Sequence, residues 1–287
     1  MTSRPVPTVR RRRLGTELRR LRNDAGMTLD QVAEHMSWDA TKVSRVENAT
    51  RNVRPPDVGR LLRIFGVDDP ELCAALEALA RDAGKRGWWQ TYGGVLASTY
   101  ADYISLESDA ESLRTYEPSL IPGLLQTAAY AREIVAGTTT RRTPQEVSAL
   151  VDVRRARQAI LTAPDRPLEL WAIVSETALR QRFAVRPETM REQLQKLLDT
   201  WELPNVTIQV MPMEATVHPG CAGGFKIVSF PGPVPDVVSL ENLIGATYVE
   251  GTDDVAAFGK AFERIRSTAL SEEDSLALIT ELEGKQL

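Results

Sequence analysis

Four polar side chains lie close together between Asp39 and Asn48, at a spacing that lets them form hydrogen bonds with another molecule as a group. They are Thr41, Lys42, Ser44 and Arg45. On a helix they occupy the outer face or its edges, because Val43 and Val46 take the inward positions. A donor-rich helix face can enter the major groove of DNA, where Arg45 would match the two acceptors of guanine. Ala40, near the helix start, can touch a thymine methyl group.

Two short helices joined by a tight turn would be needed to present this face. The first has an apolar stripe at helical spacing, made of Leu29, Val32, Ala33 and Met36. Thr28 and Gln31 match a capping box at its start, and Asp39 is a suitable N-cap for the second helix. Ala33 is small where the two helices would press closest. An ordinary helical hairpin with a solvated polar face has the same spacing, so spacing alone leaves both interpretations open.

The run GMTLDQVAEHM…ATKVSRVEN resembles the Xre, or lambda-repressor-like, helix-turn-helix family. That family typically has Leu-Ala in the first helix and Ile-Ser-Arg-Ile-Glu in the second, where this chain has Val32-Ala33 and the run 43–47. The resemblance implies a DNA-binding transcriptional regulator. Leu29 stands where the family often has a glutamine that helps grip a phosphate. Ser37 stands where the turn usually carries glycine, so it must adopt the turn without glycine's freedom.

Further basic and polar side chains flank this motif. The predicted DNA-contacting set is completed by Arg10, Arg11, Arg12, Arg13, Thr28, Arg51 and Arg54. We expect residues 1–13 to form a flexible basic arm whose arginines meet phosphates, or reach into the minor groove. A solvated helix start is the alternative interpretation of the arginine block.

The charge of the chain is distributed unevenly. Its 287 residues carry a formal net charge of −4, which by itself argues weakly against nucleic-acid binding. Up to Gly66, however, 14 lysines and arginines face 7 acidic residues, a net of +7 that leaves −11 for the remainder. A basic head joined to an acidic body is typical of a DNA-binding module fused to a regulatory or partner-binding domain.

Composition and motifs weigh against several other classes. No apolar run reaches the roughly 18 residues that span a bilayer, and no secretory signal is present, so we expect a cytoplasmic protein that joins the nucleoid when bound to DNA. Cys73 and Cys221 give no disulfide framework. His218 and Cys221 lie close together, but no second pair of metal ligands accompanies them. We therefore predict no metal, no cofactor and no catalytic residues.

The remaining pattern predicts a two-domain α+β protein. We expect an all-α, five-helix domain at 14–84, a linker at 85–94, and a mixed α+β domain with a moderate-sized sheet at 95–287. In the larger domain, strands are predicted at 168–174, 206–211, 225–230, 237–240 and 247–249. Helices are predicted at 100–116, from 122 towards 135, and at 144–161, 176–183, 187–201, 253–269 and 272–282.

A second resemblance covers nearly the whole chain, about residues 14 to 285. The strings YEPSLIPGLLQTAAYAREIV, NVTIQVMP, GGFKIVSF and ALSEEDSLALI look like the domain of unknown function that follows an Xre-type motif in many regulators of sporulating, filamentous bacteria. WhiJ-like regulators belong to this group. The resemblance implies a role in transcription, often beside a small companion protein encoded next door. It supplies no catalytic residues.

Two stretches are predicted to bind a ligand or partner. Trp88 and Trp89 lie in the glycine-rich linker, where large apolar rings would pack as a wedge or line a pocket. The loop 116–127 carries Leu120, Ile121, Leu124 and Leu125, which we expect to be exposed beside that site. Plain core packing is the alternative for all six residues.

These patterns together favour a sequence-specific DNA-binding transcriptional regulator with a sensing domain. One helix reads few bases, so we expect a homodimer, joined mainly through apolar helix faces near both ends of the body, on an inverted-repeat operator in double-stranded DNA. The alternative is a protein-interaction module that binds a small companion protein, with DNA contact secondary. An enzyme fused to a DNA-binding head is least favoured.

Overall fold

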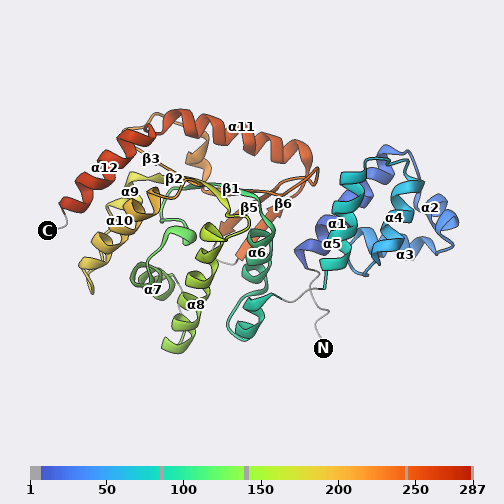
Figure 1. Cartoon of the computed structure of the whole chain (residues 1–287), viewed down its shortest axis with the longest axis horizontal. Helices are drawn as coiled ribbons and strands as arrows, with labels where there is room; N and C mark the ends of the chain where they lie inside the picture. Colours follow the sequence, from blue (N-terminus) through green and yellow to red (C-terminus); the bar gives the residue numbers. More distant parts are fainter. Residues whose placement is uncertain (1–7, 85–86, 139–141, 243–244, 286–287) are drawn as a thin grey trace. The chain divides into compact units, whose positions relative to one another are not determined.

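A computed structural model describes residues 8–84, 87–138, 142–242 and 245–285. The chain divides into two compact units (Figure 1). The first comprises Met1–Gln90 together with Phe230–Pro235, and the second comprises Thr91–Ser229 together with Asp236–Leu287. The N-terminal unit is helical and the C-terminal unit is mixed α+β, which confirms the fold class predicted from the sequence.

Five helices build the N-terminal unit. They are α1 (Val9–Asp24), α2 (Leu29–Met36), α3 (Ala40–Glu47), α4 (Pro55–Ile64) and α5 (Pro70–Asp82). Their apolar stripes meet in one core, in which Leu14, Val32, Met36, Val43 and Leu62 are buried. Proline at the first turn of α4 and of α5 suits a helix start, because the missing amide hydrogen would have had no partner there.

The first helix begins earlier than the sequence pattern predicted. It starts at Val9 rather than near Leu14, because Thr8 caps it by accepting from the Arg11 amide at 3.4 Å. Val9 is completely buried, and the Thr8 hydroxyl donates to the carbonyl oxygen of Ala83 at 3.2 Å. The prediction that residues up to Arg13 form a flexible arm was therefore wrong from residue 8 onward.

A six-stranded sheet organises the C-terminal unit, in the order β3-β2-β1-β4-β5-β6. The strands are β1 (Ser112–Glu117), β2 (Glu169–Ser175), β3 (Val206–Met211), β4 (Phe225–Ser229), β5 (Val237–Asn242) and β6 (Gly245–Val249). β1, β2 and β3 are mutually parallel, whereas β4, β5 and β6 continue the sheet in antiparallel fashion. Five of these strands fall within about two residues of their predicted ranges.

Helices cover both faces of the sheet, as Figure 1 shows. They are α6 (Ser98–Asp109), α7 (Ala128–Gly137), α8 (Pro144–Arg157), α9 (Glu176–Leu179), α10 (Glu188–Trp201), α11 (Thr252–Thr268) and α12 (Glu272–Gly284). On one face, Phe262 and Ile265 of α11 pack against Tyr116, Ile173 and Ile227 of the strands. The helices α6, α7 and α8 lie on the opposite side of the sheet.

Three predicted helices end or break sooner than expected. The helix predicted at 100–116 stops at Asp109, because Ala110 turns to extended backbone, and the residues after it form β1 at the centre of the sheet. The helix predicted from Pro122 is interrupted: a 3-10 turn, η2 (Gly123–Leu125), precedes extended Gln126, and α7 begins only at Ala128. The helix predicted at 176–183 contains only the four residues of α9.

Candidate nucleic-acid interface

The turn between α2 and α3 has the local geometry that the sequence predicted. Thr28 and Gln31 form both halves of a capping box, at 3.2 and 2.8 Å. Ser37 ends α2 in the left-handed region, with φ 55° and ψ 44°, so a non-glycine residue does make this turn. The Trp38 amide donates to the carbonyl oxygen of Ala33 at 2.8 Å, and Asp39 then caps α3 through the Lys42 amide at 2.7 Å.

The two faces of α3 differ sharply in chemistry. Val43, Val46 and Glu47 are buried against the rest of the unit. Thr41 and Arg45, one turn apart, are exposed, and Ala40, Lys42 and Ser44 are half-buried at the edges. Arg45 forms no ion pair or side-chain hydrogen bond with any described residue. Its guanidinium is therefore available to a partner, as a base-reading side chain must be.

Positive charge extends beyond α3 on one side. The Lys42 ammonium lies 3.5 Å from the centre of the Trp38 ring, in cation–π contact. Partial burial lowers the pKa of Lys42, and the nearby charge of Arg51 lowers it further. Arg54 is largely exposed and pairs with Asp57 at 3.1 Å. These three basic side chains, close together in space, can attract a phosphate backbone.

A short chain of hydrogen bonds at the end of α3 was missed by the sequence reasoning. The Asn48 amide nitrogen donates to the Ser44 hydroxyl at 3.2 Å, and the Arg19 guanidinium of α1 donates to the Asn48 oxygen. Ser44 is therefore held by a neighbour rather than free to rotate. Arg19 and Asn48 both remain exposed.

A buried ion pair and a glycine hold α3 against α1. The Arg22 guanidinium donates to both carboxylate oxygens of Glu47, at 2.6 and 3.0 Å, and to the carbonyl oxygen of Met27 at 2.8 Å. At Gly15 a Cβ atom would lie 2.5 Å from the Glu47 carbonyl oxygen and 2.9 Å from that of Val46. Only a residue without a side chain allows the two helices to approach this closely. A glycine within an otherwise favourable helix was the one sequence signal for this contact.

The arginine block is part of α1 rather than of an arm ahead of it. Arg10 donates to the carbonyl oxygen of Asp82 at 3.4 Å, at the end of α5. Arg11 and Arg12 are half-buried, and Arg13 is only 5% exposed. The block therefore has less freedom to reach DNA than the sequence suggested, and phosphate contact by these arginines stays a prediction.

Comparison with known families agrees with this architecture. Residues 13–84 match a family described as "Helix-turn-helix domain", and residues 100–281 match "Domain of unknown function (DUF5753)". The chain belongs to the DUF5753 family. No curated protein and no solved structure matches the chain. The helix-turn-helix domain indicates a DNA-binding regulator rather than an enzyme.

The loop that precedes α7 in the DUF5753 domain is not exposed, so that prediction was wrong. Ile121, Leu124 and Leu125 are each at most 2% exposed, and Leu120 is half-buried. Side-chain amides form the hydrogen bonds that water would otherwise form with the backbone of this loop. Gln126 donates to the Ile121 oxygen, Gln193 donates to the Leu125 oxygen, and the Thr127 amide donates to Gln193, each at 2.7 Å. The Gln158 side chain also donates to the Gln126 oxygen, at 2.6 Å. The apolar loop is core.

The two linker tryptophans have different environments. Both lie in a short 3-10 helix, η1 (Trp88–Tyr92), with their rings edge to face at 5.9 Å between centroids. Trp89 is 7% exposed, whereas Trp88 is 42% exposed. A role for this pair in binding a ligand or partner stays a prediction.

The described parts of the chain contain neither a cluster of metal ligands nor a membrane-spanning helix. No group of three or more His, Cys, Asp or Glu side chains there could hold a metal ion. His218 and Cys221 lie beside the short helix η4 (Pro219–Ala222), where the His218 Nδ1 atom accepts from the Gly220 amide at 3.1 Å. No described helix is long and apolar enough to cross a bilayer.

Proposed function

We propose that this protein is a sequence-specific, DNA-binding transcriptional regulator of the Xre type, in which α3 reads base edges in the major groove. The observation that carries the proposal is the exposed face of α3, where Arg45 has no partner among the described residues and Thr41 lies one turn before it. A guanidinium that is free, exposed and mounted on a rigid helix suits bidentate recognition of guanine.

The proposed phosphate contacts surround this helix. Lys42, Arg51 and Arg54 supply positive charge on one side, and the N-terminus of α2 at Thr28 offers backbone amides to a phosphate. Arg11 and Arg12, half-buried at the start of α1, are further candidates. Contacts of this kind fix position on DNA without reading its sequence.

We further propose that two copies bind an inverted repeat, because one recognition helix contacts few base pairs. The apolar helix faces that motivated dimerisation through the body, however, are used within the chain. Phe262 and Ile265 of α11 pack on the sheet, and Ile279 and Leu282 of α12 are buried. A dimer must therefore form through other surfaces of the DUF5753 domain, or on the DNA itself.

For the DUF5753 domain we propose a sensing or docking role like that of the WhiJ-like regulators that the sequence resembles. The alternative function starts from this domain: a module that binds a small companion protein, with DNA contact secondary. The match of residues 13–84 to a helix-turn-helix domain supports the first proposal, and so does the exposed Arg45, which has no partner among the described residues.

The test is selection of genomic DNA fragments by the full-length protein, followed by affinity measurements on the selected sequence. Arg45→Ala should weaken binding by about 1–3 kcal/mol and relax the preference at one base position. Arg155→Ala, which removes an exposed arginine of α8 in the DUF5753 domain, is the matched control and should bind as the wild type does. The number of protein chains bound to each DNA fragment tests whether two copies bind together.

Two results would overturn the assignment. If no genomic fragment is enriched, the companion-protein alternative replaces DNA recognition as the main function. If Arg45→Ala weakens binding equally on every sequence, Arg45 is a phosphate contact and base reading by α3 is not carried by this residue.

A further inference from the structure

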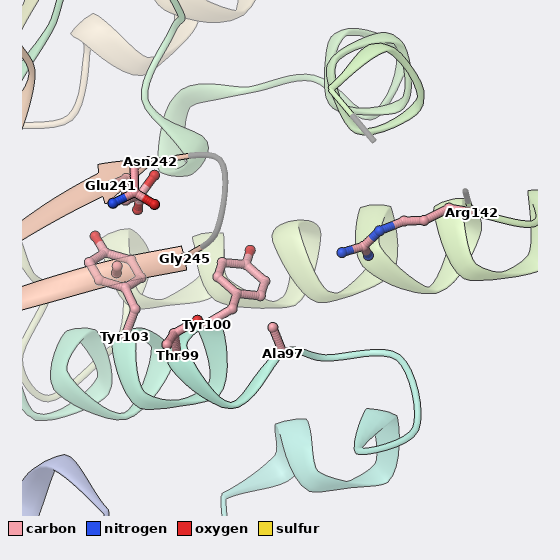
Figure 2. A pocket seen from close by; sticks show the side chains of 9 residues that line it. Ala97, Thr99, Tyr100, Tyr103, Arg142, Glu241, Asn242 and Gly245 are labelled. Carbon is pink, nitrogen blue, oxygen red and sulfur yellow. The ribbon is translucent and has the colours of Figure 1, made fainter. Parts of the chain in front are cut away.

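A pocket of about 220 Å³ opens in the DUF5753 domain between α6, the β5–β6 hairpin and the residues just before α8. Figure 2 shows Tyr100 and Tyr103 rising from α6, Glu241 and Asn242 on β5, and Arg142 reaching in from the opposite side. This volume corresponds to roughly seven water molecules at liquid density, enough for a small metabolite but not a nucleotide.

One end of the pocket carries an unsatisfied positive charge. The Arg142 guanidinium points toward Tyr100 in Figure 2, and its buried Nη1 atom has no hydrogen-bond partner in the part of the chain that the structure describes. A buried charged donor without an acceptor is costly, so an anion at this position would relieve it. A carboxylate matches a guanidinium best, through two parallel hydrogen bonds.

The other end carries the Glu241 carboxylate, which lies within a group of paired charges that includes Lys226 and Arg157. The Lys226 ammonium lies 2.9 Å from a carboxylate oxygen of Glu117 and 2.9 Å from one of Glu241, so two carboxylates share one cation. Burial opposes ionisation of Glu241, but the charge of Lys226 prevails and lowers its pKa. The Glu241 side chain is still 51% exposed, and its second oxygen is available to a donor from a ligand.

The wall between these ends is held in place by a second buried ion pair. Arg157 donates to both oxygens of Glu107, at 2.7 and 2.6 Å, and also to the Tyr100 hydroxyl at 2.6 Å. Because that hydroxyl accepts from Arg157, its own hydrogen remains to be donated into the pocket. Opposite it, a Cβ atom at Gly245 would lie 2.9 Å from the Thr99 hydroxyl, so glycine allows β6 to approach α6 and close the pocket wall.

A pocket with an unsatisfied guanidinium nitrogen at one end and a half-exposed carboxylate at the other is complementary to a small molecule that carries both charges. We propose that it binds a zwitterionic metabolite of the amino-acid class, with its carboxylate on Arg142 and its ammonium group toward Glu241. The tyrosines of α6 would contact the rest of the molecule, and the Tyr100 hydroxyl would donate to the carboxylate.

Binding can be measured on the full-length protein without DNA, so the inference is tested separately from the proposed DNA recognition. The standard free L-amino acids at millimolar concentration are the probes, with melting temperature as the screen and calorimetry for the affinity. At least one should raise the melting temperature saturably. The affinity for the desamino analogue of that amino acid should no longer depend on Glu241. The affinity for its decarboxylated analogue should no longer depend on Arg142.

Arg142→Gln and Glu241→Gln should each lower the affinity for the amino acid by roughly 10-fold or more, since each substitution removes one charge-assisted contact. Arg155→Gln on the exposed side of α8 and Glu272→Gln at the start of α12 are the matched controls and should bind normally. Because Glu241 also pairs with Lys226, each variant is compared with its own unliganded melting temperature. Absence of a saturable shift with every amino acid, or an unchanged affinity in Arg142→Gln, would overturn the proposal.

Discussion

The close contact between α1 and α3 makes Gly15→Ala a sharp test of how the recognition helix is held. A methyl group at this position would lie 2.5 Å from the carbonyl oxygen of Glu47 and 2.9 Å from that of Val46. Both atoms belong to the backbone of α3, which cannot rotate aside as a side chain can. The two helices must therefore separate, and α3 must move relative to the rest of its unit.

The expected cost follows from two opposing terms. Alanine is favoured over glycine in a helix by about 0.8–1.0 kcal/mol. Overpacking of a tight contact costs about 1–3 kcal/mol, and a contact this short against backbone belongs at the upper end of that range. We therefore expect a net loss of about 1–2 kcal/mol. The Arg22–Glu47 ion pair adds to the penalty if the separation lengthens its hydrogen bonds.

Amide hydrogen exchange on the full-length protein measures this loss locally. Peptides from α1 and α3 should exchange roughly 5–30-fold faster in Gly15→Ala. Gly59→Ala is the matched control in the same unit: its methyl group would meet the ends of the Glu77 and Arg63 side chains, which can swing away, rather than backbone. That variant should be more stable by about 0.5–1 kcal/mol, because it removes a glycine from the interior of α4.

The reasoning fails if the amides of α1 and α3 exchange at the same rate in Gly15→Ala as in Gly59→Ala. It also fails if Gly15→Ala loses stability while DNA affinity is untouched, because displacement of α3 must move Arg45 as well.

Two further predictions concern backbone strain and pH. Ser37→Gly should stabilise the N-terminal unit by about 0.5–1 kcal/mol in urea unfolding. The left-handed backbone at this position costs a non-glycine residue about 1–2 kcal/mol, and the greater conformational entropy of glycine in the unfolded chain offsets part of the gain. Ser37→Val should destabilise the unit. Burial raises the pKa of Tyr130 to about 12. The folded state thus favours the neutral phenol. The contribution of Tyr130 to the free energy of unfolding should be fully present below pH ~10 and should fall by roughly 2–3 kcal/mol as the pH rises to 12. Tyr130→Phe should flatten that part of the stability profile, and an unchanged profile would contradict the assignment.

The motif around α3 could be predicted from the sequence because each of its determinants is local. The caps at Thr28 and Asp39 act on amides three residues away, and Val43 and Val46 mark the inner face by spacing alone. The clamp on α3 was not predictable in this way. Arg22 and Glu47 are 25 residues apart, and nothing in either neighbourhood indicates that they meet.

The central strand β1 was missed for a related reason. Leu106, Ala110 and Leu113 happen to repeat at helical spacing, so the pattern predicts one helix across the true boundary. What makes β1 a strand is pairing with β2 and β4, which a local window does not contain. Similarly, the loop before α7 is buried because Gln193 satisfies its backbone from another helix.

The pocket in the DUF5753 domain was invisible to sequence reasoning altogether. Tyr100, Arg142 and Glu241 lie far apart in the chain and belong to three different segments. Taken singly, each resembles an ordinary surface residue. Only the packing of α6 against β6, which depends on Gly245, brings them around one space.

The position of β1 in the sheet also sets an order for folding on the ribosome. The five helices of the N-terminal unit lie within residues 9–82 and can pack together early, whereas the Phe230–Pro235 segment of the same unit emerges much later. Ser112 of β1, by contrast, pairs with Glu169 on one side and with Ser229 on the other, 57 and 117 residues later. Until β4 has been synthesised, one edge of β1 has no partner and can pair with another chain. A nascent chain that stalls before Phe225 would thus lack both β4 and the Phe230–Pro235 segment of the N-terminal unit, and would expose an unpaired strand edge that favours aggregation.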